Sequence, residues 1–271
     1  MQQKVRVAEV ARLKSEARKI VMVTAYDYPT GRLADEAGVD MVLVGDSLGN
    51  TVLGFDDTIP VRLEHMIHHS AAVRRGCKRP LLVGDMPFMT YKINSQEALR
   101  NAARLVQEGG CEAVKLEGGR SRAETIRMIV DAGIPVMGHI GLVPQSIHAL
   151  SGYRAQGREE HEAEALVEDA LALQEAGCFA IVLEAVTWPT AEKITRSLKV
   201  PTIGIGSGAA CDGQVLVLND LLGLNFDTPP RFVKEYADVK TTMRRAIEQF
   251  ASEVRDGAYP DKEHAYGTKN M

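Results

Sequence analysis

A short unit repeats along the chain and constrains the fold more than any other feature of the sequence. Each copy reads as the end of a helix, a Gly suited to the helix C-cap, and a short apolar strand that a polar residue closes. Repetition of this kind is typical of alternating helices and strands. The clearest copies are EAGVDMVLVGD (36–46), EGGCEAVKLE (108–117) and EAGCFAIVLE (175–184), and KRPLLVGDMPF (78–88) and DAGIPVMGHIG (131–141) share part of the pattern.

Eight apolar runs predict eight strands, and helical patterns fall between most of them. The clearest helix follows Asn94, with an early acid at Glu97, an apolar stripe and a stopping Gly. Residues 121–133 and 159–177 read similarly. Runs that are apolar throughout suit parallel strands that are buried on both faces. The predicted strands are 20–25, 40–45, 80–84, 112–117, 134–139, 178–184, 200–205 and 214–218.

Eight such units favour a closed α/β barrel, the (β/α)8 TIM barrel, over an open doubly wound sheet. No Gly-x-Gly-x-x-Gly fingerprint opens the chain, which counts against a dinucleotide-binding fold. Residues 206–213 are too few for a full helix, so we expect a shortened connection there. A length of 271 residues would permit two domains, but one barrel of about 250 residues is equally allowed. We expect a single domain over 1–271, with C-terminal helices from about 229 and a polar tail from about 257.

Charge and composition exclude several classes of protein. The net charge is −4 without a long basic run, which argues against nucleic acid as a partner. The charged start lacks the apolar core of a signal peptide, and no stretch approaches the roughly 20 apolar residues of a membrane span. The four cysteines are widely spaced, which favours buried thiols in a reducing compartment. These features predict a cytoplasmic protein.

Three acids follow predicted strands at equivalent places. Because the chemistry of such barrels lies at the carboxyl ends of the strands, Asp46, Asp85 and Glu117 should meet at one mouth. Carboxylates crowded together repel one another, and a divalent cation relieves that repulsion. Oxygen ligands favour Mg²⁺ over Zn²⁺. Each Asp alone would more simply cap the following segment, but three acids with a nearby Lys favour a metal site.

Other polar residues at the strand ends leave more than one interpretation open. Lys115 shares a strand face with Glu117, so it suits a substrate carboxylate or, alternatively, a structural ion pair with Glu117. Glu184 lacks a nearby basic residue and is a candidate general base. His139 is either a structural histidine or a substrate contact. GIGSG (204–208) is more simply a tight turn than an anion cradle, and HMIHH (65–69) a solvated helix face.

With those residues identified, the chain resembles the ketopantoate hydroxymethyltransferase family over nearly its whole length. Long motifs in the same order carry the resemblance, which makes it specific. They are TAYDYPTGRLADEAGVDMVLVGDSLGN, GDMPF, AVKLEGG, GHIGLVPQ, LEAV, TIGIGSG, NDLLGL and the tail YPDKEHAYG.

The resemblance implies a (β/α)8 barrel of the phosphoenolpyruvate/pyruvate-like type, with extra terminal helices and assembly into decamers. It implies hydroxymethyl transfer from 5,10-methylenetetrahydrofolate to 3-methyl-2-oxobutanoate, which forms 2-dehydropantoate for pantothenate synthesis. The implied cofactor is Mg²⁺ at Asp46, Asp85 and Glu117, with methylenetetrahydrofolate as co-substrate. The implied substrate contacts are Asp46, Ser47, Asp85 and Lys115, and the implied base is Glu184.

Three other functions stay open at this point. Lys115 would form a Schiff base in a Lys-based aldolase. A metal-dependent carbon–carbon lyase of the isocitrate lyase or phosphonopyruvate type would use the same kind of barrel, although no reactive Cys is evident at a strand-end loop. A barrel kept only as a binding or scaffold protein would be expected to have lost at least one of the acids, and none is lost.

Overall fold

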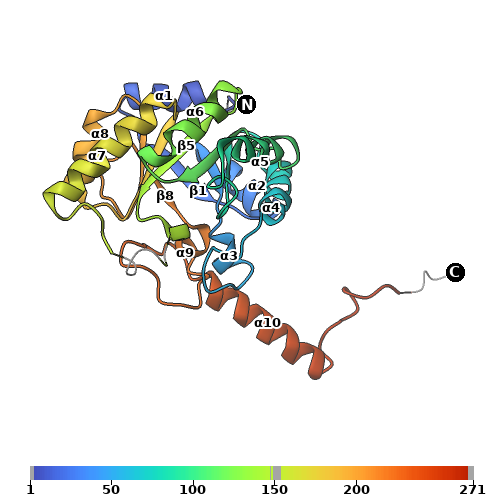
Figure 1. Cartoon of the computed structure of the whole chain (residues 1–271). Helices are drawn as coiled ribbons and strands as arrows, with labels where there is room; N and C mark the ends of the chain where they lie inside the picture. Colours follow the sequence, from blue (N-terminus) through green and yellow to red (C-terminus); the bar gives the residue numbers. More distant parts are fainter. Residues whose placement is uncertain (1–2, 147, 149–153, 268–271) are drawn as a thin grey trace. The chain divides into compact units, whose positions relative to one another are not determined.

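The barrel is closed by eight parallel strands. The computed structural model describes residues 3–146, 148 and 154–267. Each strand pairs in parallel with the next, and β8 pairs with β1, which closes the sheet (Figure 1). All eight lie at the predicted positions, so the predicted barrel is confirmed. The strands are β1 Ile20–Thr24, β2 Met41–Val44, β3 Leu81–Asp85, β4 Ala113–Glu117, β5 Val136–Gly141, β6 Ala180–Glu184, β7 Thr202–Ile205 and β8 Gly213–Leu216.

Helices follow most of the strands and cover the outside of the barrel, as the repeat predicts. Residues 206–212 contain no helix, which confirms the shortened connection between the last two strands. Gly177, in the third copy of the repeat, has a φ of 98° just after a helix, a conformation that Gly adopts without strain. The covering helices are α2 Tyr28–Glu36, α4 Leu63–Gly76, α5 Ser95–Gln107, α6 Ala123–Asp131, α7 Glu160–Glu175 and α8 Trp188–Ser197. A short helix, α3 Leu48–Thr51, follows β2 at its carboxyl end, and 3₁₀ turns lie at Arg120–Arg122 and Pro144–Ser146.

Helix α5 shows how local sequence fixes these elements. The side chain of Asn94 accepts a hydrogen bond of 2.8 Å from the backbone N–H of Glu97, which caps the first turn. Ala98, Ala102 and Leu105 then repeat at helical spacing and are fully buried. Burial of the Leu105 side chain alone contributes about 2 kcal/mol. The predicted cap and apolar stripe are therefore both present.

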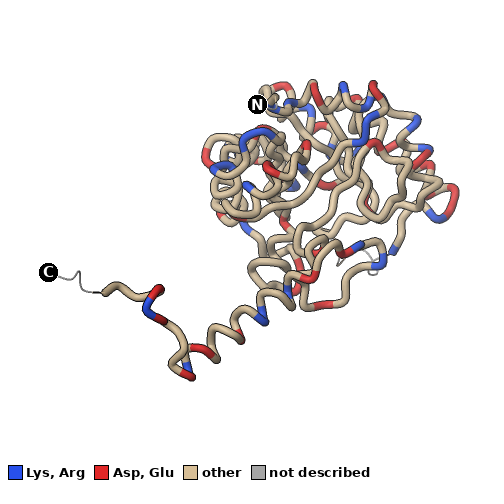
Figure 2. The backbone as a smooth tube through the Cα atoms, turned by 180° about the vertical axis from the view of Figure 1, so that it is seen from behind, with Lys and Arg blue, Asp and Glu red and all other residues tan. Residues whose placement is uncertain are grey.

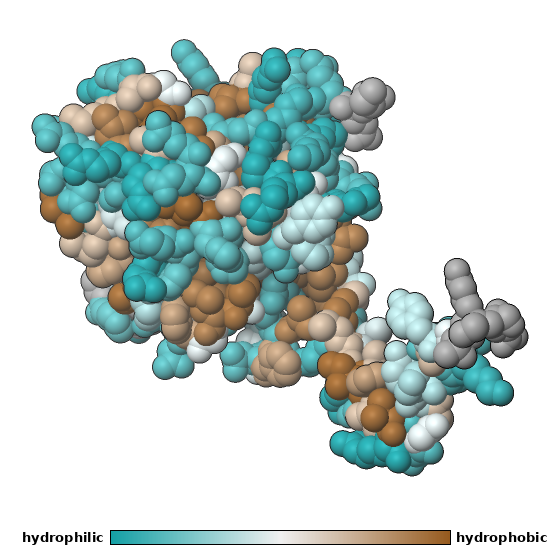
Figure 3. Space-filling view, turned by 90° about the vertical axis from the view of Figure 1, so that its right-hand side faces the viewer, coloured by the Kyte–Doolittle hydropathy of each residue, from teal (hydrophilic) through white to brown (hydrophobic). Residues whose placement is uncertain are grey.

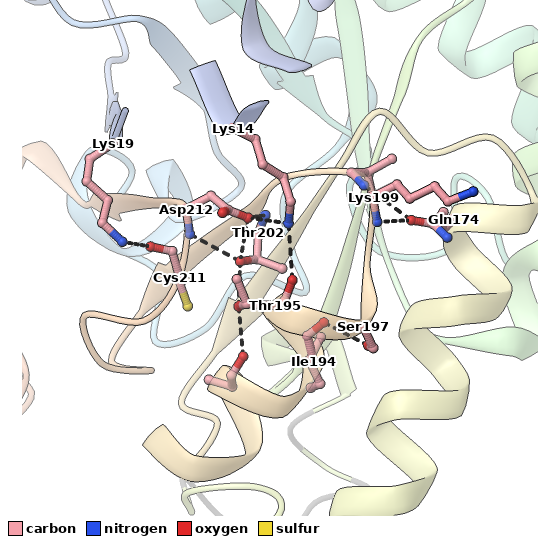
Figure 4. A network of polar contacts seen from close by, with 12 residues as sticks. Lys14, Lys19, Gln174, Ile194, Thr195, Ser197, Lys199, Thr202, Cys211 and Asp212 are labelled. Atoms are coloured by element: carbon pink, nitrogen blue, oxygen red, sulfur yellow. Dashed lines mark hydrogen bonds and ion pairs between the residues drawn. The ribbon is translucent and has the colours of Figure 1, made fainter. Parts of the chain in front are cut away.

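An N-terminal helix, α1 (Val7–Ser15), closes the amino-terminal end of the barrel. Val10 and Leu13 are buried in the same core cluster as residues of the barrel interior such as Met137. The ammonium of Lys14 lies 2.8 Å from the carboxylate of Asp212, which also accepts a hydrogen bond from the backbone N–H of Thr202 (Figure 4). Because α1 closes the amino-terminal end, we expect the active site at the carboxyl-terminal end of the strands.

The chain divides into two compact units, Met1–Leu218 and Asn219–Met271. The long helix of the second unit is α10 (Val239–Arg255), and a short helix, α9, spans Leu218–Leu221. Helix α10 begins ten residues later than the expected start of about 229, because its cap is Asp238, whose side chain accepts a hydrogen bond from the backbone N–H of Thr241. Residues 257–267 contain neither helix nor strand, as expected of the polar tail. A single domain over the whole chain stays a prediction.

Helix α10 carries an exposed apolar stripe. Met243, Ile247, Phe250 and Val254 recur at helical spacing, and each side chain is about half exposed or more, from 47% to 64%. Hydrophobic residues are visible on the surface of this C-terminal segment in Figure 3. An amphipathic helix of this kind is a candidate contact surface.

Residues of both signs of charge are distributed along the chain. In Figure 2, Lys and Arg residues are interspersed with Asp and Glu residues along the backbone. In the part of the chain that the structure describes, no helix combines the length and the apolar character that a membrane crossing requires.

Candidate active site

Four neighbouring strand pairings bring the predicted acids to one rim of the barrel. Asp85 pairs with Lys115 across β3 and β4, Glu117 pairs with His139 across β4 and β5, and Gly141 pairs with Glu184 across β5 and β6. Asp46 follows β2 by two residues, beside the end of β3. Residues that are distant along the chain are therefore neighbours at the carboxyl ends of parallel strands.

Asp46, Asp85 and Lys115 form the most buried part of the cluster. The backbone N–H of Asp46 donates a hydrogen bond of 3.1 Å to Asp85 Oδ2, and Lys115 Nζ lies 3.0 Å from Asp85 Oδ1. None of the three residues is more than 6% exposed. The ion-pair partner of Lys115 is therefore Asp85, rather than the Glu117 considered from the sequence.

Gln145 holds two of the acids in place, a role that the strand-end pattern did not reveal. Its Nε2 donates hydrogen bonds of 2.9 Å to Asp46 Oδ2 and to the carbonyl of Met86, and its backbone N–H donates to Glu117 Oε2 at 3.2 Å. Tyr91 donates its hydroxyl to Gln145 Oε1 at 2.6 Å. The signal that could have found Gln145 is its place at the end of the motif GHIGLVPQ.

The buried acids disfavour simultaneous ionisation. Burial raises the pKa of Asp85 to about 7, although Lys115 opposes the rise. Burial, and then the charge of Asp46, raise the pKa of Glu117 well above its usual range. Burial disfavours the charge of Lys115, but the attraction of Asp85 and Glu117 exceeds that penalty and raises its pKa, so the ammonium is kept. Positive charge added at this rim would stabilise the ionised acids.

The oxygen donors at this rim fit a hard divalent cation bound through few protein ligands. Asp85 Oδ1 is fully buried and faces the ammonium of Lys115 at 3.0 Å, and Asp46 and Glu117 are held nearby by Gln145. Within 3–146, 148 and 154–267, no group of three or more His, Cys, Asp or Glu is arranged to hold a metal ion. Mg²⁺ commonly uses one or two carboxylates and keeps several waters, so the two observations agree.

His139 connects this cluster to Glu184. Its Nδ1 lies 3.2 Å from Lys115 Nζ, and its Nε2 lies 3.2 Å from Glu184 Oε2. The residue is only 2% exposed. The structure thus brings all four predicted acids into one connected group.

Glu184 is the most accessible of these acids, with 19% of its side chain exposed. Two backbone positions near Glu184 have positive φ angles. Gly141 has a φ of 97°, and a Cβ there would lie 2.3 Å from the carbonyl oxygen of Glu184. Ala185 has a φ of 49°, a conformation that costs energy in a residue with a side chain. The carboxylate therefore sits at a tightly constrained turn that opens toward solvent.

The remaining strand-end residues support the backbone of the rim. Ser47, which follows Asp46 in the sequence, shares a hydrogen bond of 2.9 Å with the hydroxyl of Tyr26. Ser207, in the GIGSG loop, donates to the carbonyl of Leu183 and accepts from the N–H of Val186, as expected of a tight turn. His69, of the HMIHH stretch, contacts the carbonyl of Tyr26 through Nδ1 at 2.6 Å.

Comparison with known proteins adds the family to this geometry. A family model described as ketopantoate hydroxymethyltransferase matches residues 4–262, which is nearly the whole chain. The chain belongs to the ketopantoate hydroxymethyltransferase family. The resemblance noted from the sequence motifs is thereby confirmed.

Relatives within the family are similar over their full length. A 3-methyl-2-oxobutanoate hydroxymethyltransferase of Syntrophotalea carbinolica is 52% identical over 266 residues, which cover 98% of this chain and 100% of the relative. One of Oleidesulfovibrio alaskensis is 54% identical over 256 residues, which cover 94% of this chain and 89% of the relative. This member of the ketopantoate hydroxymethyltransferase family is an enzyme, a hydroxymethyltransferase of the one-carbon type.

Solved structures place the fold in a wider group. A phosphonopyruvate hydrolase superposes with a TM-score of 0.63 at 13% identity, covering 96% of this chain and 93% of that chain. A 2,3-dimethylmalate lyase, described as a member of the PEP mutase/isocitrate lyase superfamily, gives a TM-score of 0.63 at 16% identity, covering 97% and 93%. At such low identity the likeness concerns the fold alone, and it agrees with the barrel type expected for the ketopantoate hydroxymethyltransferase family.

Proposed function

We propose that this enzyme transfers a hydroxymethyl group from 5,10-methylenetetrahydrofolate to 3-methyl-2-oxobutanoate and forms 2-dehydropantoate for pantothenate biosynthesis. The observation that carries the proposal is the connected group of Asp46, Asp85, Glu117, Lys115 and Glu184 at one rim, in a chain 52% identical to a 3-methyl-2-oxobutanoate hydroxymethyltransferase. Such a group combines the charges that an oxo-acid substrate needs with a candidate base.

Asp46, Asp85 and Glu117 are the residues that we assign to Mg²⁺, one or two of them as direct ligands and the others through water. A phosphonopyruvate hydrolase with the same fold was crystallised with oxalate and Mg²⁺, which supports the use of a divalent cation. When bound, Mg²⁺ would supply Lewis-acid stabilisation for negative charge on the oxo acid. Gln145 and Tyr91 keep the carboxylates oriented for that task.

Lys115 and Ser47 are the residues that we assign to the substrate, together with Asp46 and Asp85. The ammonium of Lys115 is buried, and the neighbouring acids raise its pKa, so it can neutralise the carboxylate of the oxo acid. Because water is largely excluded there, that attraction is stronger than it would be at the surface.

Glu184 is the group that we assign to proton removal. Its carboxylate takes the proton from the carbon next to the keto group, and the electrons of that carbon–hydrogen bond delocalise onto the keto oxygen as an enolate. Water breaks both carbon–nitrogen bonds of the folate's methylene bridge, so tetrahydrofolate leaves and the carbon is delivered at the oxidation level of formaldehyde. The enolate carbon bonds to that carbon, and the former carbonyl oxygen takes back a proton and becomes the hydroxyl of the product. The partial exposure of Glu184 gives the folate access to this step.

The geometry argues against the rival chemistries. A Schiff-base Lys needs a lowered pKa to be nucleophilic, whereas the neighbours of Lys115 raise its pKa. The lyase alternative has support only from structures of 13–16% identity, which concern the fold. A non-catalytic barrel does not agree with relatives that are themselves hydroxymethyltransferases.

The cellular compartment and the number of subunits are inferred from the cysteines, the family resemblance and helix α10. We place it in the cytoplasm, because all four cysteines are buried and free, which suits a reducing compartment. We also expect a homo-oligomer, a decamer as the family resemblance implies, and the apolar stripe of α10 supports an interface between chains. Light scattering of the purified enzyme measures the number of subunits.

The decisive test is an assay of product formation and of hydrogen exchange. The enzyme should form 2-dehydropantoate only with methylenetetrahydrofolate, and in D₂O it should exchange the C3 proton of 3-methyl-2-oxobutanoate. Chelation of divalent cations should abolish both activities, and re-addition of Mg²⁺ should restore them. Glu124→Gln, a change at an exposed site on α6, serves as the matched control and should behave as wild type. Exchange that survives chelation would contradict the proposal, as would borohydride trapping of substrate on Lys115.

A further inference from the structure

His139 lies between two residues to which the proposed mechanism gives different tasks. Its Nδ1 is 3.2 Å from the ammonium of Lys115, and its Nε2 is 3.2 Å from Glu184 Oε2. At 2% exposure, the ring is shielded from solvent. A buried imidazole with both nitrogens aimed at charged groups is expected to have one defined proton arrangement.

The chemistry of Lys115 fixes that arrangement. An ammonium group has three donors and no acceptor, so Nδ1 faces Lys115 with its lone pair. In a neutral imidazole the proton then resides on Nε2, the nitrogen that faces Glu184. Glu117 Oε1 is the other group near Nδ1, but at 3.8 Å it is farther away than Lys115 Nζ.

The second ring nitrogen, Nε2, faces Glu184. His139 Nε2 is a buried nitrogen without a hydrogen-bond partner of good angle among the described residues, although Glu184 Oε2 is within reach. Glu184 Oε2 is the acceptor that lies within 3.2 Å of Nε2, on a side chain that is 19% exposed.

We propose that His139 is a positioning residue, which the ammonium of Lys115 holds as the Nε2–H tautomer so that it donates to Glu184 Oε2. The donated hydrogen bond fixes the orientation of the carboxylate and leaves Oε1 free to take the substrate proton. Through His139, Lys115, which we assign to the substrate carboxylate, is linked to Glu184, the proposed base. Binding of the substrate at Lys115 thereby aligns Glu184. This inference rests on the proposed function of Glu184.

A matched pair of substitutions separates the two contacts of the ring. In His139→Gln, the amide nitrogen takes the place of Nε2 and keeps a donor toward Glu184. In His139→Asn, the shorter side chain keeps a polar group near Lys115 but does not reach Glu184. The measurements are kcat and KM for exchange of the C3 proton of 3-methyl-2-oxobutanoate in D₂O, with oxo-acid affinity by calorimetry on the Mg²⁺-loaded enzyme.

We expect His139→Asn to lose about 10²-fold in kcat for exchange, because small misplacement of a reacting group has effects of that size. Its oxo-acid affinity should stay close to that of wild type, and His139→Gln should keep most of the rate. In the Glu184→Gln background, His139→Asn should cause no further loss, because both residues act on one step. Equal losses in the Asn and Gln variants, or losses that add in full, would overturn the positioning role.

The outcomes distinguish this inference from the proposed function. If Glu184→Gln abolishes exchange but the Asn and Gln variants are equivalent, only the role of His139 fails. If Glu184→Gln leaves exchange unchanged, Glu184 is not the base, and both assignments fail. A readout independent of the variants is ¹⁵N NMR of ring-labelled histidine in the wild-type enzyme. An unprotonated Nδ1 and a protonated Nε2 are expected for His139, and a protonated Nδ1 would overturn the inference.

Discussion

Lys115 on β4 forms its buried ion pair with Asp85 on the neighbouring strand β3, with Nζ 3.0 Å from Oδ1. The side chains of Lys115 and Asp85 are 5% and 2% exposed, so water does not solvate either charge and each is the other's counter-charge. The pair stands at the centre of the site, because Asp85 also accepts from Asp46 and Lys115 also contacts His139.

Removal of one partner should destabilise the fold more than removal of both. Lys115→Met leaves the Asp85 carboxylate buried without its counter-charge, at a cost of about 3–5 kcal/mol in the free energy of unfolding. The double variant Lys115→Met with Asp85→Asn leaves no unpaired charge and should recover part of that loss. Urea unfolding without Mg²⁺ measures both. A double variant less stable than Lys115→Met would show that the ion pair does not explain the burial of the two residues.

Asp85→Asn alone should weaken the Mg²⁺-dependent binding of 3-methyl-2-oxobutanoate. The substitution keeps the shape of the side chain but removes a negative charge that we assign to the cation. Calorimetry with and without Mg²⁺ should show that most of the stimulation by the metal is lost, while Glu124→Gln retains it. Normal Mg²⁺ dependence in Asp85→Asn would undo the assignment of Asp85 as a metal ligand.

Gln145→Leu should lower the affinity for the metal although it changes none of the residues that we assign as metal ligands. The change removes the donors to Asp46 and Met86, and loss of such orienting contacts typically costs 10–100-fold in metal affinity. Titration with Mn²⁺, followed by electron paramagnetic resonance, measures the dissociation constant. Tyr91→Phe removes a single hydrogen bond to Gln145 and should have a smaller effect. Equal affinities in wild type and Gln145→Leu would show that Gln145 does not orient the carboxylates.

The thiols should be inert in the folded enzyme at pH 8. Burial raises the pKa of Cys77 to about 11 and that of Cys178 to about 12, so the reactive thiolate is scarce. Because the folded pKa of Cys77 exceeds the ordinary value of 9.0, the stability it contributes is fully present below pH 9.0 and is lost as the pH rises toward about 11. An aromatic disulfide reagent should modify the thiols only after unfolding in urea. Rapid modification of native enzyme would contradict this burial.

The barrel could be predicted from the sequence because its signals are local. Apolar runs such as 178–184 and the Asn94 cap are visible without a structure, and each predicts one element. The start of the C-terminal helix could not be placed as well, because it depends on which polar residue caps the helix, and in the structure that residue is Asp238.

The candidate site could be predicted where chemistry coincides with a strand end. Asp85, Glu117 and Glu184 each close a strand, so fold and sequence point to the same residues. The partner of Lys115 could not be predicted, because it depends on the register between β3 and β4. Gln145 lies in a 3₁₀ turn after β5, where no periodic pattern reveals its contacts. The roles of these residues stay predictions until they are measured.

The central claim is that the acids at one rim divide between holding a divalent cation and removing a proton. The most direct measurement is deuterium exchange at C3 of 3-methyl-2-oxobutanoate by Glu184→Gln, with Mg²⁺-dependent binding of the oxo acid measured in parallel. We expect binding close to that of wild type and exchange slower by about 10²–10⁴-fold, the usual contribution of a general base. Wild-type exchange in Glu184→Gln would contradict the account.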